Sequence, residues 1–416
     1  MSITVLAPRA GAGIEPMDEF LGAPAGAGLA APFAQERLDT LGELSRAMLA
    51  DAQLRADPAA VSLAYWLRPA SLARFRQNYE QRLAADASLR LAPCGGVFHV
   101  APGNVDTVFV YSWALAYLCG NRNVVRVSGQ QSPLLAALLA RLAALMETRP
   151  ALAAANRFVT YAHDDAITTR LSLWAAHRVL WGGDETVGAL RRLPLSPHSS
   201  ERTFGSKFSY SALSVPAVLA ASEPAIAALA AGYFNDIFWF DQMACSSPQL
   251  LYWVGGGDPE AAMARLHAAL EAEIARRRYR GSASNAVHRL NFAFDLACEE
   301  NAGVQMELGH GEFLPLRLAP GTPVYKRHCG AGLFTHVPVA TVEEVAAAAG
   351  PADQTLTHFG FSDAELDRLA EAAGRCGVDR IVPVGEALAF EPNWDGYDLL
   401  GDFLRRVVVR QAAGSA

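Results

Sequence analysis

The sequence lacks the cysteine patterns that cross-link small secreted domains or hold structural zinc. Its 416 residues include six cysteines, which are scattered and form no CxxC pair. Disulfide frameworks and zinc sites use closely spaced thiols, so neither is expected, and the sequence predicts no metal centre. Unpaired thiols favour the reducing interior of a cell, and a cytoplasmic protein is predicted.

Long apolar runs and basic runs are also absent. The most apolar stretch, residues 212–231, is interrupted by Pro216, Glu223 and Pro224. It cannot supply the roughly 20 continuous apolar residues of a membrane span. The N-terminus has no basic region followed by an apolar run, so no signal peptide is predicted. With a net charge of −7 and no basic run longer than residues 276–278, nucleic acid is not an expected partner.

The composition that is present indicates a globular chain of two domains. Half of the residues (51%) are hydrophobic and only 19% are charged, which favours large buried cores. Residues 1–33 are rich in Gly, Ala and Pro and show no periodicity, so they predict an irregular arm. Residues 34–85 repeat apolar positions at helical spacing and predict two or three helices.

Beyond the helices, short apolar strands alternate with helical patterns. Predicted helices at 107–118 and 132–147 follow the first and the second of these strands. This alternation predicts a doubly wound parallel sheet, whose ligands bind at the carboxyl ends of the strands. The predicted strands are 95–102, 123–127, 157–162 and 177–181.

The pattern changes near residue 205, where we place a domain boundary. Residues 206–385 mix strands and helices, with a strong helix at 259–278, and predict a second α/β domain. Residues 386–416 return to short apolar segments and a last helix at 398–407. We expect this tail to pack back onto the first domain, residues 34–205.

The first candidate for chemistry is Cys245, within the segment DQMACSSP at 241–248. Small residues around a thiol leave room for a substrate carbon. A turn that enters a helix would lower the thiol pKa and help to bind an oxyanion. The alternative is a buried structural cysteine.

The second candidate is Asn104, which follows the first strand of the sheet in the string APGN. An amide at the carboxyl end of a strand can donate two hydrogen bonds into the ligand cleft. The alternative is that Asn104 caps the helix expected to begin near Asp106.

The third candidate is the strand–glycine–helix segment WGGDETVG at 181–188. Glycines allow a pyrophosphate to approach the backbone, and a helix N-terminus favours its charge. The chain contains no GxGxxG fingerprint, so an ordinary loop is the alternative.

Taken together and in order, these segments resemble the aldehyde dehydrogenase superfamily and, within it, the LuxC-type acyl-CoA (fatty acid) reductase family. The narrower resemblance rests on the strings HVAPGNVD, WGGDE, RTFGSKFS, FDQMACSSPQ and RIVPVGEALAFEPNWDGYDLL. It implies an aldehyde dehydrogenase-like α/β fold, with a cofactor domain (34–205 and 386–416) and a catalytic domain (206–385). It implies Cys245 as the nucleophile and Asn104 as the oxyanion donor. It also implies cofactor-binding residues at Arg126, Ser128, Trp181, Gly182 and Gly183.

Three departures from the superfamily pattern refine this reading. Phe204 stands where aldehyde-oxidising members carry the Glu that activates water, which favours reduction over oxidation. Arg126 and Gly129 replace a Lys and a Glu that read the adenine ribose, which favours NADPH over NADH. Asp184 replaces a Ser at the pyrophosphate turn and is expected to act as a helix N-cap.

The implied function is NADPH-dependent reduction of an acyl thioester, long-chain in this family, to an aldehyde through an acyl-cysteine. The donor would be acyl-CoA, an acyl carrier or a partner acyl-synthetase, and a homo-oligomer is implied. The family is associated with aldehyde supply for bioluminescence. His310 and His328 are candidate proton donors. An aldehyde-oxidising enzyme and a non-catalytic acyl-binding subunit are the alternatives.

Overall fold

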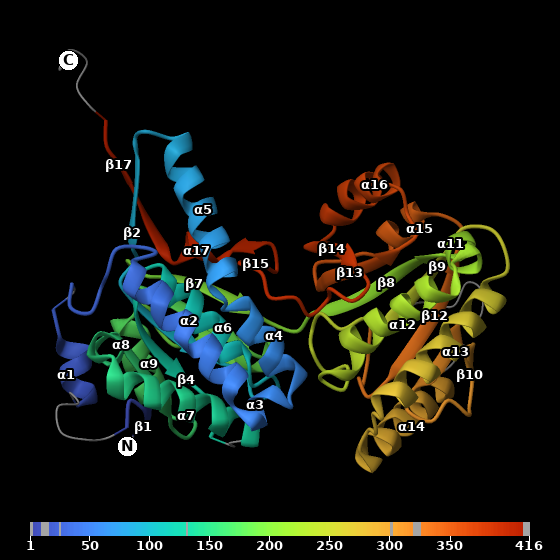
Figure 1. Cartoon of the computed structure of the whole chain (residues 1–416), viewed down its shortest axis with the longest axis horizontal. Coiled ribbons are helices and arrows are strands. Elements are labelled where there is room, and N and C mark those ends of the chain that lie inside the picture. The colour runs from blue at the N-terminus through green and yellow to red at the C-terminus, as the bar shows by residue number, and fades with distance from the viewer. Residues whose placement is uncertain are drawn as a thin grey trace. The chain divides into compact units, whose positions relative to one another are not determined.

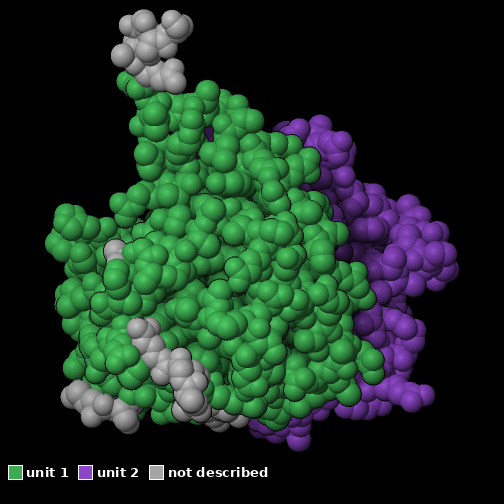
Figure 2. Space-filling view, turned by 60° about the vertical axis from the view of Figure 1, so that its left-hand side comes forward, with its two compact units in different colours: residues 1–205, 390–416 green, residues 206–389 purple. Residues whose placement is uncertain are grey.

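The computed structural model describes residues 3–9, 16–24, 26–129, 132–299, 303–318 and 326–410. The chain forms two compact units, residues 1–205 with 390–416, and residues 206–389 (Figures 1 and 2). These bounds lie close to the divisions expected at residues 205 and 385. The cofactor and catalytic roles assigned to the units stay predictions.

The first unit is built on a six-stranded sheet in the order β1-β5-β4-β3-β6-β7. The five strands from β5 to β7 are parallel, as the alternating pattern predicts, and β1 adds antiparallel to the β5 edge. The strands are β1 (Thr4–Ala7), β3 (Gly96–Val100), β4 (Arg122–Arg126), β5 (Asn156–Thr160), β6 (His177–Trp181) and β7 (Ser200–Phe204).

Alternate residues of these strands face two different cores because successive side chains of a strand point to opposite faces. Val97 and Val125 pack with the larger core, whereas Phe98 and Val124 pack with the smaller one. The connecting helices are α6 (Val108–Leu118), α7 (Pro133–Thr148), α8 (Pro150–Ala155), α9 (Asp165–Trp174) and α10 (Asp184–Arg191). Every residue of α6 from Phe109 to Leu118 is buried, so this helix is the centre of the larger core.

The N-terminal region is more ordered than expected. Its described residues include β1 and the short helix α1 (Met17–Gly22), so the prediction of an irregular arm over 1–33 is wrong for these parts. Apolar side chains explain the difference, because Phe20 and Ala7 are both fully buried. Four helices follow instead of two or three: α2 (Gln35–Ala50), α3 (Ala52–Arg55), α4 (Pro58–Trp66) and α5 (Pro69–Ala85).

The C-terminal segment returns to the first unit, as expected, but not as a long helix. Only α17 (Leu399–Asp402) is helical, and β17 (Leu404–Val408) pairs antiparallel with β2 (Leu89–Pro93). The helix predicted at 398–407 is therefore wrong. Pairing with β2 supplies the backbone hydrogen bonds that helix formation would have supplied locally. A small hairpin, β15 (Asn393–Trp394) with β16 (Tyr397–Asp398), precedes α17.

The second unit holds a seven-stranded sheet in the order β10-β11-β12-β9-β8-β13-β14, parallel except for β10. Its strands are β8 (Phe208–Ser214), β9 (Leu250–Val254), β10 (Val304–Met306), β11 (Leu314–Leu318), β12 (Leu333–Val339), β13 (Asp353–Phe359) and β14 (Arg380–Pro383). Its helices are α11 (Val215–Ala220), α12 (Glu223–Phe238), α13 (Pro259–Arg277), α14 (Ala283–Cys298), α15 (Val342–Ala347) and α16 (Asp363–Gly374). The helix expected at 259–278 is thus α13.

Both faces of this second sheet are covered. Leu251 and Trp253 of β9 pack with α12 and α13 on one face, and Leu250 and Tyr252 pack with α15 and α16 on the other. Each unit therefore has a doubly covered sheet of its own.

Candidate active site

Cys245 lies in the turn that joins α12 to β9 in the second unit, and its side chain is exposed. The residues that follow it, Ser246 to Gln249, are buried. The turn begins with Asp241 and Gln242 at positive φ of 49° and 61°. An exposed thiol on a turn whose neighbours are buried is open to a substrate yet held on a fixed backbone.

Buried side-chain amides hold this turn in place. Nε2 of Gln242 donates to the carbonyls of Pro248 (2.8 Å) and Leu333 (2.9 Å), and its Oε1 accepts from the N–H of Gly332 at 2.9 Å. Nε2 of Gln249 donates to the Gln242 carbonyl at 2.8 Å. These bonds tie the cysteine turn to the start of β12 and satisfy backbone groups that would otherwise be buried unpaired.

Two residues from neighbouring strands contact Cys245 directly. The hydroxyl of Ser209 on β8 donates to the Cys245 carbonyl at 2.7 Å. Nε2 of Gln354 on β13, a fully buried residue, donates to Cys245 Sγ at 3.5 Å. Hydrogen bonds to a charged acceptor are stronger than those to a neutral one, so the Gln354 amide favours the thiolate. Neither residue is among the predicted site residues: Ser209 ends the string RTFGSKFS without a role assigned to it, and no local motif marks Gln354.

One part of the Cys245 prediction is wrong. The turn leads into strand β9 and not into the predicted helix, so the expected helix N-terminus after Cys245 does not form. The side chain of Gln354 on β13 donates to the sulfur instead.

The turn is also connected to a buried carboxyl group. Ser247 Oγ donates to the Asp236 carbonyl at 2.7 Å, and the Asp236 carboxylate accepts from the N–H groups of Gly385 (2.6 Å) and Ala387 (3.0 Å). Burial raises the pKa of Asp236 to about 7, against the two backbone bonds that lower it.

Three of the other cysteines have the properties of structural thiols. Burial raises the pKa of Cys94 to about 12 and that of Cys329 to about 11, and it raises the pKa of Cys119 well above its ordinary value. These thiols are therefore un-ionised near neutral pH, whereas Cys298 and Cys376 are exposed.

Asn104 lies in the first unit, on the connection from β3 to α6, with its side chain exposed. Helix α6 begins at Val108 with Thr107 as its N-cap, and no side chain caps it. The alternative that Asn104 caps this helix is therefore wrong. Its role as an oxyanion donor stays a prediction.

Arg126 and Ser128 lie at the carboxyl end of β4, the edge where the predicted sheet binds ligands. The Arg126 guanidinium lies 4.8 Å from the centre of the Tyr161 ring and donates to the Tyr161 carbonyl at 3.5 Å. Its Nε is buried without a hydrogen-bond partner. A Cβ added to Gly103 would lie 3.8 Å from Ser128 Oγ, so the turns after β3 and β4 lie side by side.

The segment WGGDE begins at a residue that belongs to the core. The Trp181 ring stacks on Phe204 at 3.8 Å and 11°, and its Nε1 donates to Ser112 Oγ at 3.2 Å. Trp181 is only 7% exposed, so its ring belongs to the larger core of the first unit. Phe204 is the buried stacking partner of Trp181, and its side chain carries no basic group.

The glycines of this segment lie where helix α10 starts. Gly183 is the N-cap, and Asp184 is the first helical residue, so the expectation that Asp184 is the N-cap is wrong. The exposed N-terminus of α10 and the buried, unpaired Nε of Arg126 both suit an anionic cofactor, which fits the predicted nicotinamide nucleotide. The carboxylates of Asp184 and Glu185, in the first turn of α10, would repel an anionic cofactor.

The two candidate proton donors lie in the second unit. The His328 ring lies 6.0 Å from that of Phe208, and burial lowers its pKa, so it is neutral near pH 7. His310 faces two carboxylates, those of Glu271 and Glu307. The identity of the proton donor stays a prediction.

Among the described residues, no helix combines the length and the apolar character needed to cross a membrane.

Comparison with known proteins places this chain in a family. The family model described as "Acyl-CoA reductase (LuxC)" matches residues 65–299. A long-chain acyl-protein thioester reductase of Aliivibrio fischeri is 29% identical over 177 residues, 42% of this chain and 35% of that protein. One from Photorhabdus laumondii is 26% identical over 184 residues, 43% of this chain and 36% of that protein. The aligned part thus spans about a third of each curated relative.

Solved structures show the same fold at low sequence identity. Aldehyde dehydrogenase 21 from Physcomitrella patens aligns with a TM-score of 0.67 at 12% identity, over 96% of this chain and 91% of that one. A putative aldehyde dehydrogenase from Burkholderia cenocepacia aligns with a TM-score of 0.62 at 17% identity, over 95% and 90%. The fold is therefore aldehyde dehydrogenase-like, as the sequence predicts. Because the family model covers more than half of the sequence, the chain belongs to the acyl-CoA reductase (LuxC) family.

Proposed function

We propose that this chain reduces an acyl thioester to an aldehyde through an acyl group carried on Cys245. The observation that carries the proposal is the exposed Cys245 thiol with the buried Gln354 amide donating to its sulfur. The relatives named as long-chain acyl-protein thioester reductases support a long-chain acyl donor, on a protein or on coenzyme A.

In the proposed reaction the Cys245 thiolate attacks the thioester carbonyl, and the donor leaves as a thiolate that takes a proton from solvent. This step conserves the acyl group as a new thioester on the enzyme. Asn104 is assigned to the oxyanion and Gln354 to the sulfur, which must be a good nucleophile first and a good leaving group later. When bound, the reduced nicotinamide supplies a hydride to the acyl carbon. Collapse of the resulting thiohemiacetal oxyanion breaks its bond to sulfur, releases the aldehyde and restores the Cys245 thiolate.

The first unit is assigned to cofactor binding, through Arg126, Ser128 and the backbone of Trp181, Gly182 and Gly183. Arg126 supports NADPH over NADH because a guanidinium binds a 2′-phosphate, and Gly129 places no carboxylate beside it. The phenyl side chain of Phe204 cannot act as a general base, so it cannot activate water to hydrolyse the acyl-cysteine. This supports reduction of the acyl group over its release as a carboxylate.

Mass spectrometry of the protein mixed with an acyl-CoA tests the covalent step. We expect the mass of one acyl group on the wild-type chain and none on Cys245→Ala. An adduct that persists in Cys245→Ala, or none on the wild type with any chain length, would contradict the proposal.

Following NADPH absorbance with a panel of acyl-CoA lengths tests turnover. We expect NADPH consumption and aldehyde production with at least one long chain. We expect Arg126→Ala to raise the KM for NADPH about tenfold or more and to change the KM for NADH little. An acyl adduct without NADPH or NADH consumption would instead indicate a non-catalytic acyl-binding subunit. A cytoplasmic location and a homo-oligomer stay predictions.

A further inference from the structure

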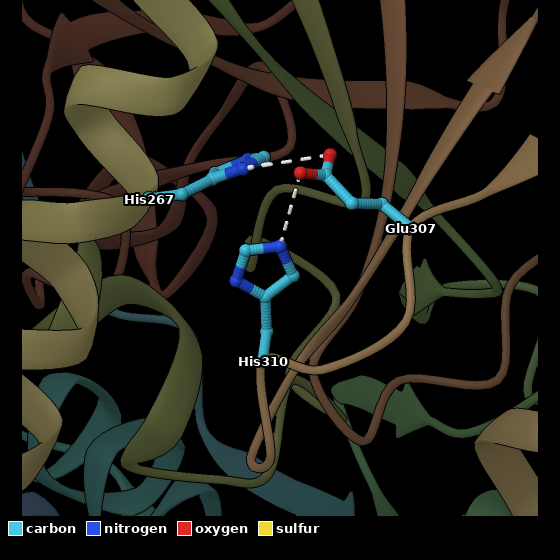
Figure 3. A group of neighbouring side chains, drawn as sticks. All are labelled: His267, Glu307 and His310. Carbon is cyan, nitrogen blue, oxygen red and sulfur yellow. Dashed lines mark ion pairs between the residues drawn. The ribbon is translucent and has the colours of Figure 1, made fainter.

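A cluster of ionisable side chains lies in the second unit, apart from the residues that contact Cys245. His267 on α13 and Glu307 and His310, which follow β10, offer imidazole nitrogens and a carboxylate oxygen within 4.8 Å of one another. Figure 3 shows the three side chains converging on one point, with His267 reaching from the helix toward the other two.

His310 faces a carboxylate with each ring nitrogen. Its Nδ1 lies 2.7 Å from Glu271 Oε1, and its Nε2 lies 3.3 Å from Glu307 Oε1. A neutral imidazole has one N–H, and the shorter contact places it on Nδ1. The Nε2 lone pair then faces the Glu307 carboxylate, which is repulsive unless a cation is present. A carboxylate on the far nitrogen is the arrangement that orients metal-binding histidines.

His267 contributes a buried nitrogen with no partner. The residue is 3% exposed, and its Nδ1 has no hydrogen-bond partner. This nitrogen is directed at Glu307, 3.9 Å from Oε2. The ring lies in the interior of the second unit, and the neutral imidazole is the form that binds metals.

The charged groups around the cluster leave an excess of negative charge. Glu307 Oε2 lies 3.0 Å from Arg317, which also pairs with Glu260. Within the part of the chain that the structure describes, the Glu271 carboxylate has one ionic contact, with His310. Glu260 and Glu307 thus share one guanidinium and Glu271 faces only His310, so carboxylates outnumber guanidinium groups here and a divalent cation would balance the excess charge.

We propose that His267, Glu307 and His310 bind a divalent transition-metal ion such as Zn²⁺, with Glu271 orienting His310. Two imidazoles and one carboxylate form a donor set that zinc uses, and they leave a coordination position for water. The spacing of the cysteines predicted no metal centre, and this site corrects that expectation. These ligands are far apart in the sequence and contain no cysteine.

A neighbouring histidine determines the proton balance of binding. Trp253 Nε1 donates to His336 Nδ1 at 2.9 Å, so the proton of neutral His336 lies on Nε2, 3.2 Å from His267 Nε2. The proton of His267 is then on Nδ1, the nitrogen that the metal would use. When the metal binds, this proton leaves to solvent, and His267 Nε2 takes the proton of His336. His336 then gains a proton from solvent on Nδ1 and loses the hydrogen bond from Trp253 Nε1. Metal binding therefore releases no net proton.

Co²⁺ titration of the full chain, after chelator treatment and desalting, tests the proposal through the visible absorption of the bound ion. We expect one equivalent of Co²⁺, displaced by Zn²⁺. We expect Glu307→Gln and His310→Gln to bind at least tenfold more weakly, and His288→Gln, a change at an exposed histidine on α14, to bind like the wild type. Binding should also persist in Cys245→Ser, which excludes the reactive thiol as a ligand.

Trp253→Phe tests the role of His267 Nδ1. Removing the indole N–H removes the hydrogen bond that metal binding must break, so we expect Co²⁺ affinity to rise about three- to tenfold. Unchanged or weaker affinity in this variant would overturn the assignment of Nδ1 as a ligand. Circular dichroism establishes that each variant is folded.

Two results would overturn the metal site itself. One is equal Co²⁺ uptake by the wild type, Glu307→Gln and His310→Gln. The other is no uptake of Co²⁺ by the wild type, for which we expect nitrogen NMR shifts to show that both nitrogens of His310 are protonated. In that case a proton alone supplies the positive charge between the carboxylates.

Discussion

At the scale of single residues, the chemistry of Cys245 depends on one buried amide. Gln354 is fully buried on β13 and donates to Cys245 Sγ at 3.5 Å. A buried donor is held in place by the sheet, so its effect on the thiolate does not require a mobile side chain.

We expect Gln354→Leu to slow alkylation of Cys245 by iodoacetamide near neutral pH about tenfold, because the thiolate loses a hydrogen bond. Mass spectrometry of the modified peptide measures the rate. Gln305→Leu on β10, which replaces an exposed glutamine, is the control and should react like the wild type. Equal rates in all three proteins would show that Gln354 does not act on the sulfur.

Asp236 gives the chain a pH-dependent stability. Burial raises its pKa to about 7 in the folded chain, above the value of about 4 expected when unfolded. The folded state thus binds the proton more tightly, and its stability falls as pH rises from about 4 through 7. In urea unfolding from pH 5 to 8, we expect Asp236→Asn to lack this decrease, which amounts to a few kcal/mol. Parallel pH profiles for both proteins would contradict the assignment.

At the scale of elements, helix α12 and the segment after β14 meet at two glycines. Gly385 has a φ of +101°, and a Cβ added to it would lie 3.0 Å from the Cα of Gly232. Neither position has space for a side chain, so the contact holds the Gly385 and Ala387 N–H groups against the Asp236 carboxylate.

We expect Gly385→Ala to lower the free energy of unfolding by about 2 kcal/mol, because alanine is strained at this φ and collides with the helix backbone. Gly188→Ala in α10 is the control, since an added Cβ there meets nothing within 4 Å. It should leave stability unchanged or raise it slightly. Urea denaturation followed by fluorescence measures both, and a control that loses as much stability as Gly385→Ala would refute the argument.

At the scale of the whole molecule, the two units differ in chain continuity. Residues 206–389 form the second unit without interruption, whereas the first unit joins residues 1–205 to 390–416. The returning segment supplies core side chains, with Leu399 and Phe403 almost fully buried, and Asp402 pairs with Arg202 at 2.6 Å.

We expect the fragment 206–389 to fold alone and to retain an alkylatable Cys245, because Gln354 and Ser209 belong to the same unit. We expect 1–205 alone to be incompletely folded, since β2 loses β17, and to fold when 390–416 is fused to it. Circular dichroism and urea transitions of the three fragments provide the test. An equally stable 1–205 fragment would show that the returning segment is dispensable.

The sequence by itself determined the parts of this protein that depend on local periodicity and on short motifs. Alternating strands and helices predicted the parallel sheet of the first unit, and HRVLW matches β6 residue for residue. The order of the motifs identified the family, and the small residues around Cys245 marked the exposed turn.

Only the tertiary structure decided the features that depend on residues distant in the chain. The segment 398–407 has a helical pattern but pairs with β2, and the N-terminal residues complete a sheet edge. Gln354 reaches Cys245, and His267 meets Glu307 and His310, because parallel strands and their connections bring distant positions together. Such contacts leave no local periodicity in the sequence, so composition and spacing could not show them.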